Sequence, residues 1–238
     1  MAAGVRGLAG APVRVVSTGA LDAWVSEHAE APHPVTVELV REHDRVVRAA
    51  LAWEAPLPAR FGQDFPSEGA LRRALAEREA ALARALERVR GAVEMTVRVL
   101  LADPAAEAEK GAEGAREGPS GPPKPPAAPD DAQVAKSAAG REYLSRLRER
   151  QRREAELRHR ADFLQTRIAR AVAGIVLEEA RTPSRPSSRS LTISHLVARR
   201  ALSDYRRALR SFVDGEPGLR VLISGPWAPY SFTEPRRE

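Results

Sequence analysis

Residues 103–137 place the strongest constraint on the fold, because this stretch cannot contribute to a hydrophobic core. Prolines stand there among glycine, alanine and scattered charge, at Pro119, Pro122, Pro123, Pro125, Pro126 and Pro129. Such a composition buries too little apolar surface to offset the entropy lost on ordering. We therefore predict a flexible, partly extended linker at 103–137, which divides the 238-residue chain into domains at residues 1–102 and 138–238.

Several functional classes are excluded by composition alone. The chain has no cysteine, which excludes disulfides, thiolate metal sites and cysteine nucleophiles and is compatible with a reducing cytoplasm. No window approaches the roughly 20 apolar residues of a membrane span, so we expect no membrane insertion. The net charge of +6, carried almost entirely by arginine, makes an acidic partner worth testing.

The first domain is predicted to be α+β. Alternating β-prone residues indicate a hairpin of residues 13–17 and 21–26 that turns at Gly19. Helical spacing predicts amphipathic helices over 36–52 and from Ser67 to about Gly91. We expect Pro56–Gly62 to be an edge or crossing strand and residues 93–99 to be a half-buried strand that closes this domain's sheet.

The second domain is predicted to be helix-rich α+β. One proline-free helix should run from 140 to about 180. Its apolar seam could face a partner helix, as in a coiled coil, or a sheet: Leu157, Ala161, Leu164, Ile168, Ala171 and Ile175. The seam fades between Arg148 and Arg153, so the first half should project as a solvated arm. A loop at 182–190, a strand from 191, a helix over 201–212 and a strand over 219–224 should follow.

Candidate chemistry is sparse. The sequence contains no phosphate-binding glycine loop, no nucleophile elbow and no zinc-binding helix motif, so we expect neither an enzyme nor a cofactor nor a small-molecule substrate. The five histidines lack a ligand pattern, which argues against a metal site. Arg60 and Asp64 could together orient a substrate, but a structural ion pair that fixes the end of the strand is the favoured interpretation.

Two surfaces are candidates for binding a partner. Residues 141–160 hold eight arginines and four glutamates, which permits an arginine-rich adaptor for nucleic acid; the interspersed glutamates favour a solvated helix, so nucleic acid is the less favoured partner. Trp227, Tyr230 and Phe232 cluster in a chain that is otherwise poor in aromatics. Packing as a C-terminal plug is favoured over an exposed anchor for another protein.

The C-terminal run Ile223–Phe232, with the sequence ISGPWAPYSF, resembles the ending of the GvpL/GvpF family of gas vesicle proteins. Three further matches occur in the family's order, at Leu57–Gly62, His43–Val47 and Gly140–Leu144. Ala228, Ala59 and Gln63 depart from the usual residues. Family members also begin with a β-strand that has no counterpart before residue 6, so we expect a truncated or misassigned start, which the intact mass of the native product would test.

The resemblance implies a two-domain α+β fold with a ferredoxin-like N-terminal sheet that lacks its first strand. It also implies a non-enzymatic role in gas vesicle assembly, in the cytoplasm at the gas vesicle. The implied partners are the small hydrophobic shell protein and other accessory gas vesicle proteins. Seven residues are the candidates for structural or partner contact: Arg60, Phe61, Tyr143, Leu144, Trp227, Tyr230 and Phe232.

Overall fold

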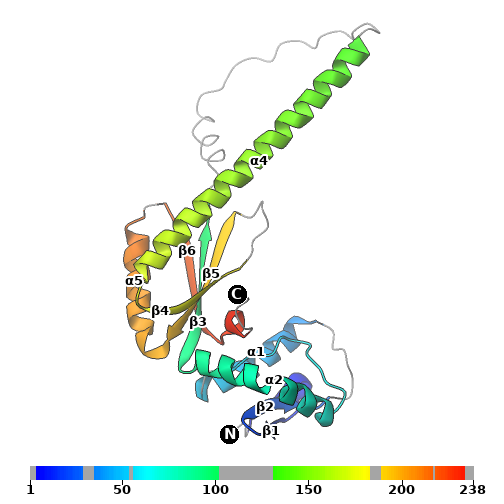
Figure 1. Cartoon of the computed structure of the whole chain (residues 1–238), viewed down its shortest axis with the longest axis vertical. Helices are drawn as coiled ribbons and strands as arrows, with labels where there is room; N and C mark the ends of the chain where they lie inside the picture. The colour runs from blue at the N-terminus through cyan, green and yellow to red at the C-terminus, as the bar shows by residue number, and fades with distance from the viewer. Residues whose placement is uncertain are drawn as a thin grey trace.

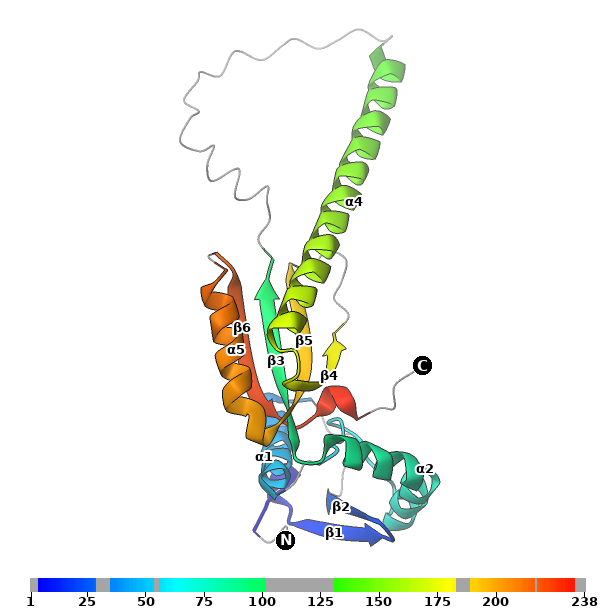
Figure 2. The same cartoon turned by 60° about the vertical axis from the view of Figure 1, so that its left-hand side comes forward.

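The computed structural model describes residues 4–28, 35–53, 56–101, 131–182, 189–216 and 218–233, with the side chains of the long helix α4 described from Tyr143 onwards. It is an α+β structure, as predicted. A four-stranded sheet carries two helices on one face, and one of these helices extends far beyond the sheet (Figure 1). The N-terminal helices and hairpin lie at the opposite end of the sheet from this extension (Figure 2).

The N-terminal elements confirm most of the sequence prediction. Strands β1 (Val13–Thr18) and β2 (Leu21–Ser26) form the antiparallel hairpin, and Gly19 in its turn has a φ of 56°. Helix α1 (Val37–Trp53) begins after Thr36, whose Oγ1 accepts from the Leu39 amide at 3.3 Å. Helix α2 (Glu68–Val89) is capped by the Ser67 side chain, which accepts from the Ala70 amide. Both helices therefore start within one residue of their predicted starts, each with a side-chain oxygen that caps its first turn.

The predicted strand at Pro56–Gly62 is wrong. Residues 56–60 have no regular secondary structure, and a turn follows in which the Gln63 amide donates to the Arg60 carbonyl at 3.3 Å. Pro56 and Pro58 have no backbone N–H, so this segment lacks two of the donors that a strand ladder requires. Leu57 instead fills a place beside the apolar cluster around Val89.

Strand β3 (Ala92–Leu100) confirms the predicted strand but not its predicted neighbours. The sheet order is β4-β5-β3-β6, in which β4 is Val176–Arg181, β5 is Ser190–Ala198 and β6 is Arg220–Trp227. All four strands pair antiparallel. The strand that was expected to close the N-terminal sheet is thus a central strand among strands of residues 176–227. The division into residues 1–102 and 138–238 stays a prediction.

Helix α4 (Asp131–Ala171) starts and ends earlier than predicted. Its first seven residues, 131–137, were predicted to belong to the linker. The remainder of the predicted linker, residues 103–130, lies outside the described residues. The helix stops before Gly174, which has a φ of 75° that a helix cannot accommodate. The residues after it were predicted to be helical and instead form β4, in which Val176 and residues 178–181 pair with β5.

The core lies between the sheet and the helices α4 and α5. Helix α5 (Leu202–Asp214) follows the short 3₁₀ turn η2 (Arg199–Ala201). Ala161, Leu164 and Ile168 of the predicted seam are buried against β3 and β5, so the seam faces the sheet. The last element is the 3₁₀ turn η3 (Tyr230–Phe232). In the described part of the chain, no helix is both long enough and apolar enough to cross a membrane.

Candidate functional site

The C-terminal segment lies between the sheet and the N-terminal helices, in contact with both (Figures 1 and 2). Phe232 is buried against Val89 of α2, Ala92 of β3 and Leu196 of β5. The Phe232 carbonyl also accepts a hydrogen bond from the Arg88 guanidinium. Phe232 therefore lies where the packing interpretation expects it, and it joins the end of the chain to α2.

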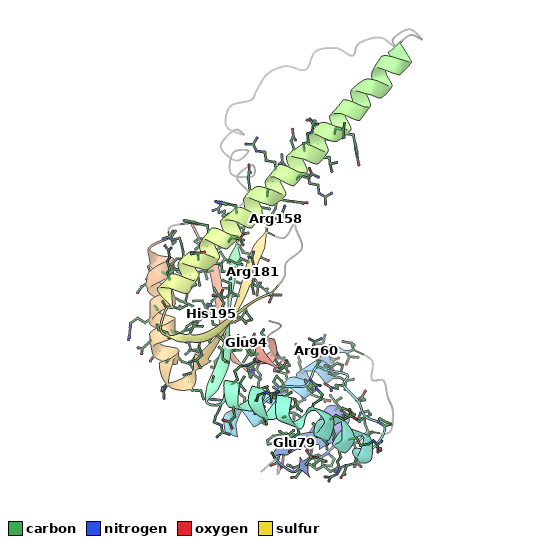
Figure 3. All side chains as sticks on the ribbon, viewed as in Figure 1. Arg60, Glu79, Glu94, Arg158, Arg181 and His195 are labelled. Atoms are coloured by element: carbon green, nitrogen blue, oxygen red, sulfur yellow. The ribbon has the colours of Figure 1, made fainter. Side chains whose placement is uncertain are left out.

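A buried carboxylate holds this segment, and the sequence did not reveal it. Glu94 of β3 is 6% exposed and lies beside η3 (Figure 3). It accepts from the Ser231 amide and from the Ser231 hydroxyl, each at 2.8 Å, and the Ser231 and Ser194 hydroxyl oxygens lie 3.1 Å apart. Charge-assisted bonds of this kind stabilise a buried carboxylate. The alternation of apolar and polar residues along β3 predicts that Glu94 faces solvent. This local pattern contains no information about η3, which covers Glu94 in the fold.

Trp227 and Tyr230 face helix α1. The Arg48 guanidinium lies 5.0 Å from the centre of the Trp227 ring, and Asp44 accepts from Arg48 at 2.6 Å. The Trp227 indole N–H donates to the Ser224 hydroxyl at 3.4 Å. Tyr230 remains 40% exposed, while burial of the rest of the side chain and the nearby Asp44 raise the pKa of its hydroxyl. Of the three aromatics, Tyr230 is the one most accessible to a partner.

Arg60 and Phe61 lie apart from the C-terminal segment in sequence but close to α1. Phe61 packs edge-on against the His43 ring, at 5.9 Å between ring centres, and the His43 ring N–H donates to the Ala59 carbonyl at 3.1 Å. Asp64 pairs with His28 at 3.1 Å. Arg60 itself is exposed.

Half of α4 projects past the sheet (Figure 1). Within α4 we name residues 143–156, which begin where its side chains are described, the arm, and we call the end of this range at Tyr143 its tip. The Tyr143 and Leu144 side chains are 67% and 50% exposed, and Leu147, one turn further on, is 39% exposed. Arg150 pairs with Glu154 and Arg152 with Glu156, each at 3.0 Å along the helix. The arm is thus a solvated helix, as predicted, with apolar side chains near its tip.

Another group that sequence analysis missed is a buried polar network around His195 (Figure 3). The His195 Nδ1 lies 2.8 Å from the Tyr205 hydroxyl, and its Nε2 lies 3.2 Å from Glu179, which also accepts from Gln165 at 2.6 Å. Burial lowers the pKa of His195, against a smaller opposing effect of Glu179, and burial raises the pKa of Tyr205. A neutral imidazole that accepts from Tyr205 and donates to Glu179 satisfies every partner.

This network links four elements. Across the described ranges there is no cluster of three or more metal-binding side chains. Sequence distance explains why the network was not foreseen, since Gln165, Glu179, His195 and Tyr205 come from α4, β4, β5 and α5. Its position in the core indicates that it fixes how these elements pack.

The profile of the family described as "Gas vesicle synthesis protein GvpL/GvpF" matches residues 1–234. The chain belongs to this family. It is 34% identical over 251 aligned positions to gas vesicle protein L of Streptomyces sp. (strain CB03234), covering 96% of this chain and 86% of that protein. It is 28% identical to gas vesicle protein F of the same strain, covering 94% of this chain and 88% of that protein. The family resemblance found from the four motifs is therefore confirmed.

Two crystal structures share the fold of this GvpL/GvpF member. One is GvpF from Microcystis aeruginosa, with a TM-score of 0.71 and 14% identity over 96% of this chain and 91% of that one. The other is GvpF from Anabaena sp. PCC7120, with a TM-score of 0.70 and 16% identity over 98% of this chain and 90% of that one. At this identity the likeness concerns the fold. The family gives the chain a gas-vesicle-associated role.

Proposed function

We propose that this protein is a non-enzymatic accessory protein of gas vesicle assembly, which acts in the cytoplasm through contact with the shell protein and other gas vesicle proteins. The observation that carries the proposal is the family match over residues 1–234, which includes every described element. A match of that extent leaves no separate described domain to which another activity would be assigned. The proposal includes no cofactor and no small-molecule substrate.

The hydrophobic effect gives a reason why assembly would require such a protein. A shell subunit with an apolar gas-facing side would aggregate before assembly unless another protein covered that side. The chain offers exposed apolar side chains on separate elements: Leu144 on the arm, Leu177 on edge strand β4, Leu222 on edge strand β6 and Tyr230 in η3. Edge strands can also accept a further strand through their main-chain groups. These features support contact with a partner protein.

The arm also favours a second candidate function. Residues 141–160, which include the arm, hold eight arginines and four glutamates and would suit a nucleic-acid adaptor. The arginines of two ion pairs along the arm, Arg150 and Arg152, already have carboxylate partners. Fewer of the charges are therefore available for phosphates, and we keep this function as the alternative that an experiment must separate.

Co-purification tests the proposal. The tagged full-length protein is purified from cells that express the shell protein, with nuclease present, and is washed at about 0.1 M and about 1 M salt. Because apolar contacts survive high salt whereas phosphate contacts weaken steeply, we expect the shell protein to stay bound through both washes. Loss of the shell protein, together with recovery of nucleic acid when nuclease is omitted, would instead support the adaptor.

A further inference from the structure

The tip of the arm continues the apolar seam of α4 beyond the sheet. In the packed half of α4, Leu157 lies against the core and Ala161 is buried in it. Tyr143 and Leu147 lie fourteen residues before these two, which is two heptads, so they lie on nearly the same side of the helix. No described element covers them, and the seam here is exposed where its continuation is buried.

The seam is interrupted between these two halves by charge. Its intermediate positions are Arg150 and Glu154, which pair with each other at 3.0 Å. The two charges neutralise each other within the helix. They separate the apolar side chains at the tip, Tyr143, Leu144 and Leu147, from the buried part of the seam. At 1.5 Å per residue, Leu147 lies about 15 Å along the helix axis from Leu157, which packs against the core, so this apolar surface lies beyond the packed half of α4.

Arginine surrounds the apolar tip. At 100° per residue, Arg146 lies on one side of Tyr143 and Leu147, and Arg148 lies on the other side, beyond Leu144. Over residues 141–160 the arginines outnumber the glutamates by eight to four. The flanks of an apolar seam are the positions at which charged side chains select the partner helix in a coiled coil. An apolar seam with basic flanks is complementary to a helix with an apolar seam and acidic flanks.

We propose that the arm tip binds an acidic amphipathic helix of another gas vesicle component, with Tyr143, Leu144 and Leu147 against that helix's apolar seam. This inference rests on the proposed function for the identity of the partner and adds its chemistry. A second copy of the chain fits less well, because pairing two arms would bring two clusters of excess positive charge together. Nucleic acid fits less well because it would leave the three apolar side chains without a matching surface.

A pair of synthetic helices tests the arm directly. The probe is a labelled peptide of roughly four heptads with Leu at the seam positions and Glu at the flanking positions, and its control carries Lys in place of Glu. Binding to the full-length protein is measured by fluorescence anisotropy. We expect the Glu peptide to bind at least about tenfold more tightly than the Lys peptide, because only the Glu peptide complements the arginines.

Variants assign the binding to the arm tip. The double variant Tyr143→Ala/Leu147→Ala should weaken the Glu peptide by about tenfold or more, since it removes the apolar contact. Arg148→Glu should also weaken it. Val40→Ala is the matched control, because Val40 is 41% exposed but lies on α1, and it should leave binding unchanged. All altered side chains are exposed, so the thermal unfolding midpoint should not change.

Other outcomes would overturn the inference. Equal affinity for the two peptides, or a double variant that binds as well as the parent, would show that the arm tip does not select an acidic helix. Tighter binding of a single-stranded oligonucleotide than of the Glu peptide would assign the arm to nucleic acid, and a dimer abolished by the double variant would assign it to a second copy. If the peptide test fails while the shell protein co-purifies, the proposed function stands without this surface.

Discussion

Glu94 of β3 and His195 of β5 are both buried, and each is held by hydrogen bonds from an element distant in sequence. Glu94 accepts from Ser231 in η3, while His195 contacts Tyr205 in α5 and Glu179 in β4. Burying such groups costs free energy unless their partners are in place. The two residues therefore select one arrangement of the C-terminal segment and one arrangement of the helices on the sheet.

The protonation of His195 should make the stability of the protein depend on pH. Burial lowers the pKa of His195 in the folded state below its unfolded value of about 6.5, so the unfolded chain binds more protons as the pH falls. The stabilisation is fully present above pH 6.5 and is lost as the pH falls from 6.5 towards the folded pKa, at up to about 1.4 kcal/mol per pH unit.

Urea unfolding of the parent and of His195→Gln between pH 7.5 and pH 5 measures this effect. The parent should lose stability on acidification, and His195→Gln should show a flatter dependence because the titrating group is gone. His159→Gln, on the exposed part of α4, is the matched control and should keep the slope of the parent. A His195→Gln slope equal to that of the parent would mean that other groups cause the dependence.

Removal of the Ser231 hydroxyl should loosen the C-terminal segment. Ser231→Ala deletes one of the two hydrogen bonds to the Glu94 carboxylate and should lower the free energy of unfolding by roughly 1–2 kcal/mol. Thr233→Ala, which removes a local hydrogen bond to the Tyr230 carbonyl, should cost less. Urea unfolding compares the two variants, and similar losses would show that Glu94 does not depend on this hydroxyl.

At the scale of elements, the sequence predicted helices and strands best where an element has one apolar face and one polar face that contacts water. The hairpin, α1, α2, β5 and α5 fall near their predicted bounds, because caps and periodicity are local signals. The end of α4 was placed too late, since Gly174 lies within an apolar pattern that fits helix and strand alike. The partners of β3 could not be predicted, because periodicity gives the two faces of a strand but not the strands beside it.

Strand β6 contains a close backbone approach that no periodicity indicates. The register between β3 and β6 shifts between Glu94 and Thr96, and one extra residue of β6 is accommodated near Gly225. A Cβ on Gly225, which has a φ of 119°, would lie 2.8 Å from the Glu94 carbonyl oxygen and 2.9 Å from the Met95 sulfur. Only glycine fits this position, which explains the glycine in the C-terminal motif in physical terms.

Two glycine variants separate the effect of crowding from that of the backbone angle. Gly174→Ala also has a positive φ, of 75°, but its Cβ would meet nothing within 4 Å, so it should cost about 1–2 kcal/mol. Gly225→Ala adds the clash and should cost roughly 2–5 kcal/mol. Urea unfolding measures both. Equal losses would indicate that β6 moves away from β3 without penalty.

For the molecule as a whole, β3 is the element that joins the two ends of the chain. It lies between β5 and β6, although residues 102–130 and α4 separate it from both in sequence. Phe232 and the Arg48–Trp227 contact join the N-terminal helices to the C-terminal segment as well. The folded parts on either side of residues 103–130 should therefore depend on each other.

A protease site inserted between residues 110 and 120 tests this dependence. After cleavage of the folded protein we expect the two fragments to co-elute in gel filtration, because β3 keeps its hydrogen bonds to β5 and β6 and its side chains stay in the core. They should separate only at urea concentrations that unfold the parent. The fragment 138–238 made alone should fail to fold, since removing β3 leaves β6 without its partner strand and exposes the core side chains of α4 and α5 to water. Fragments that separate in buffer, or a folded 138–238 fragment, would show instead that the chain consists of two independent domains, as its linker alone would suggest.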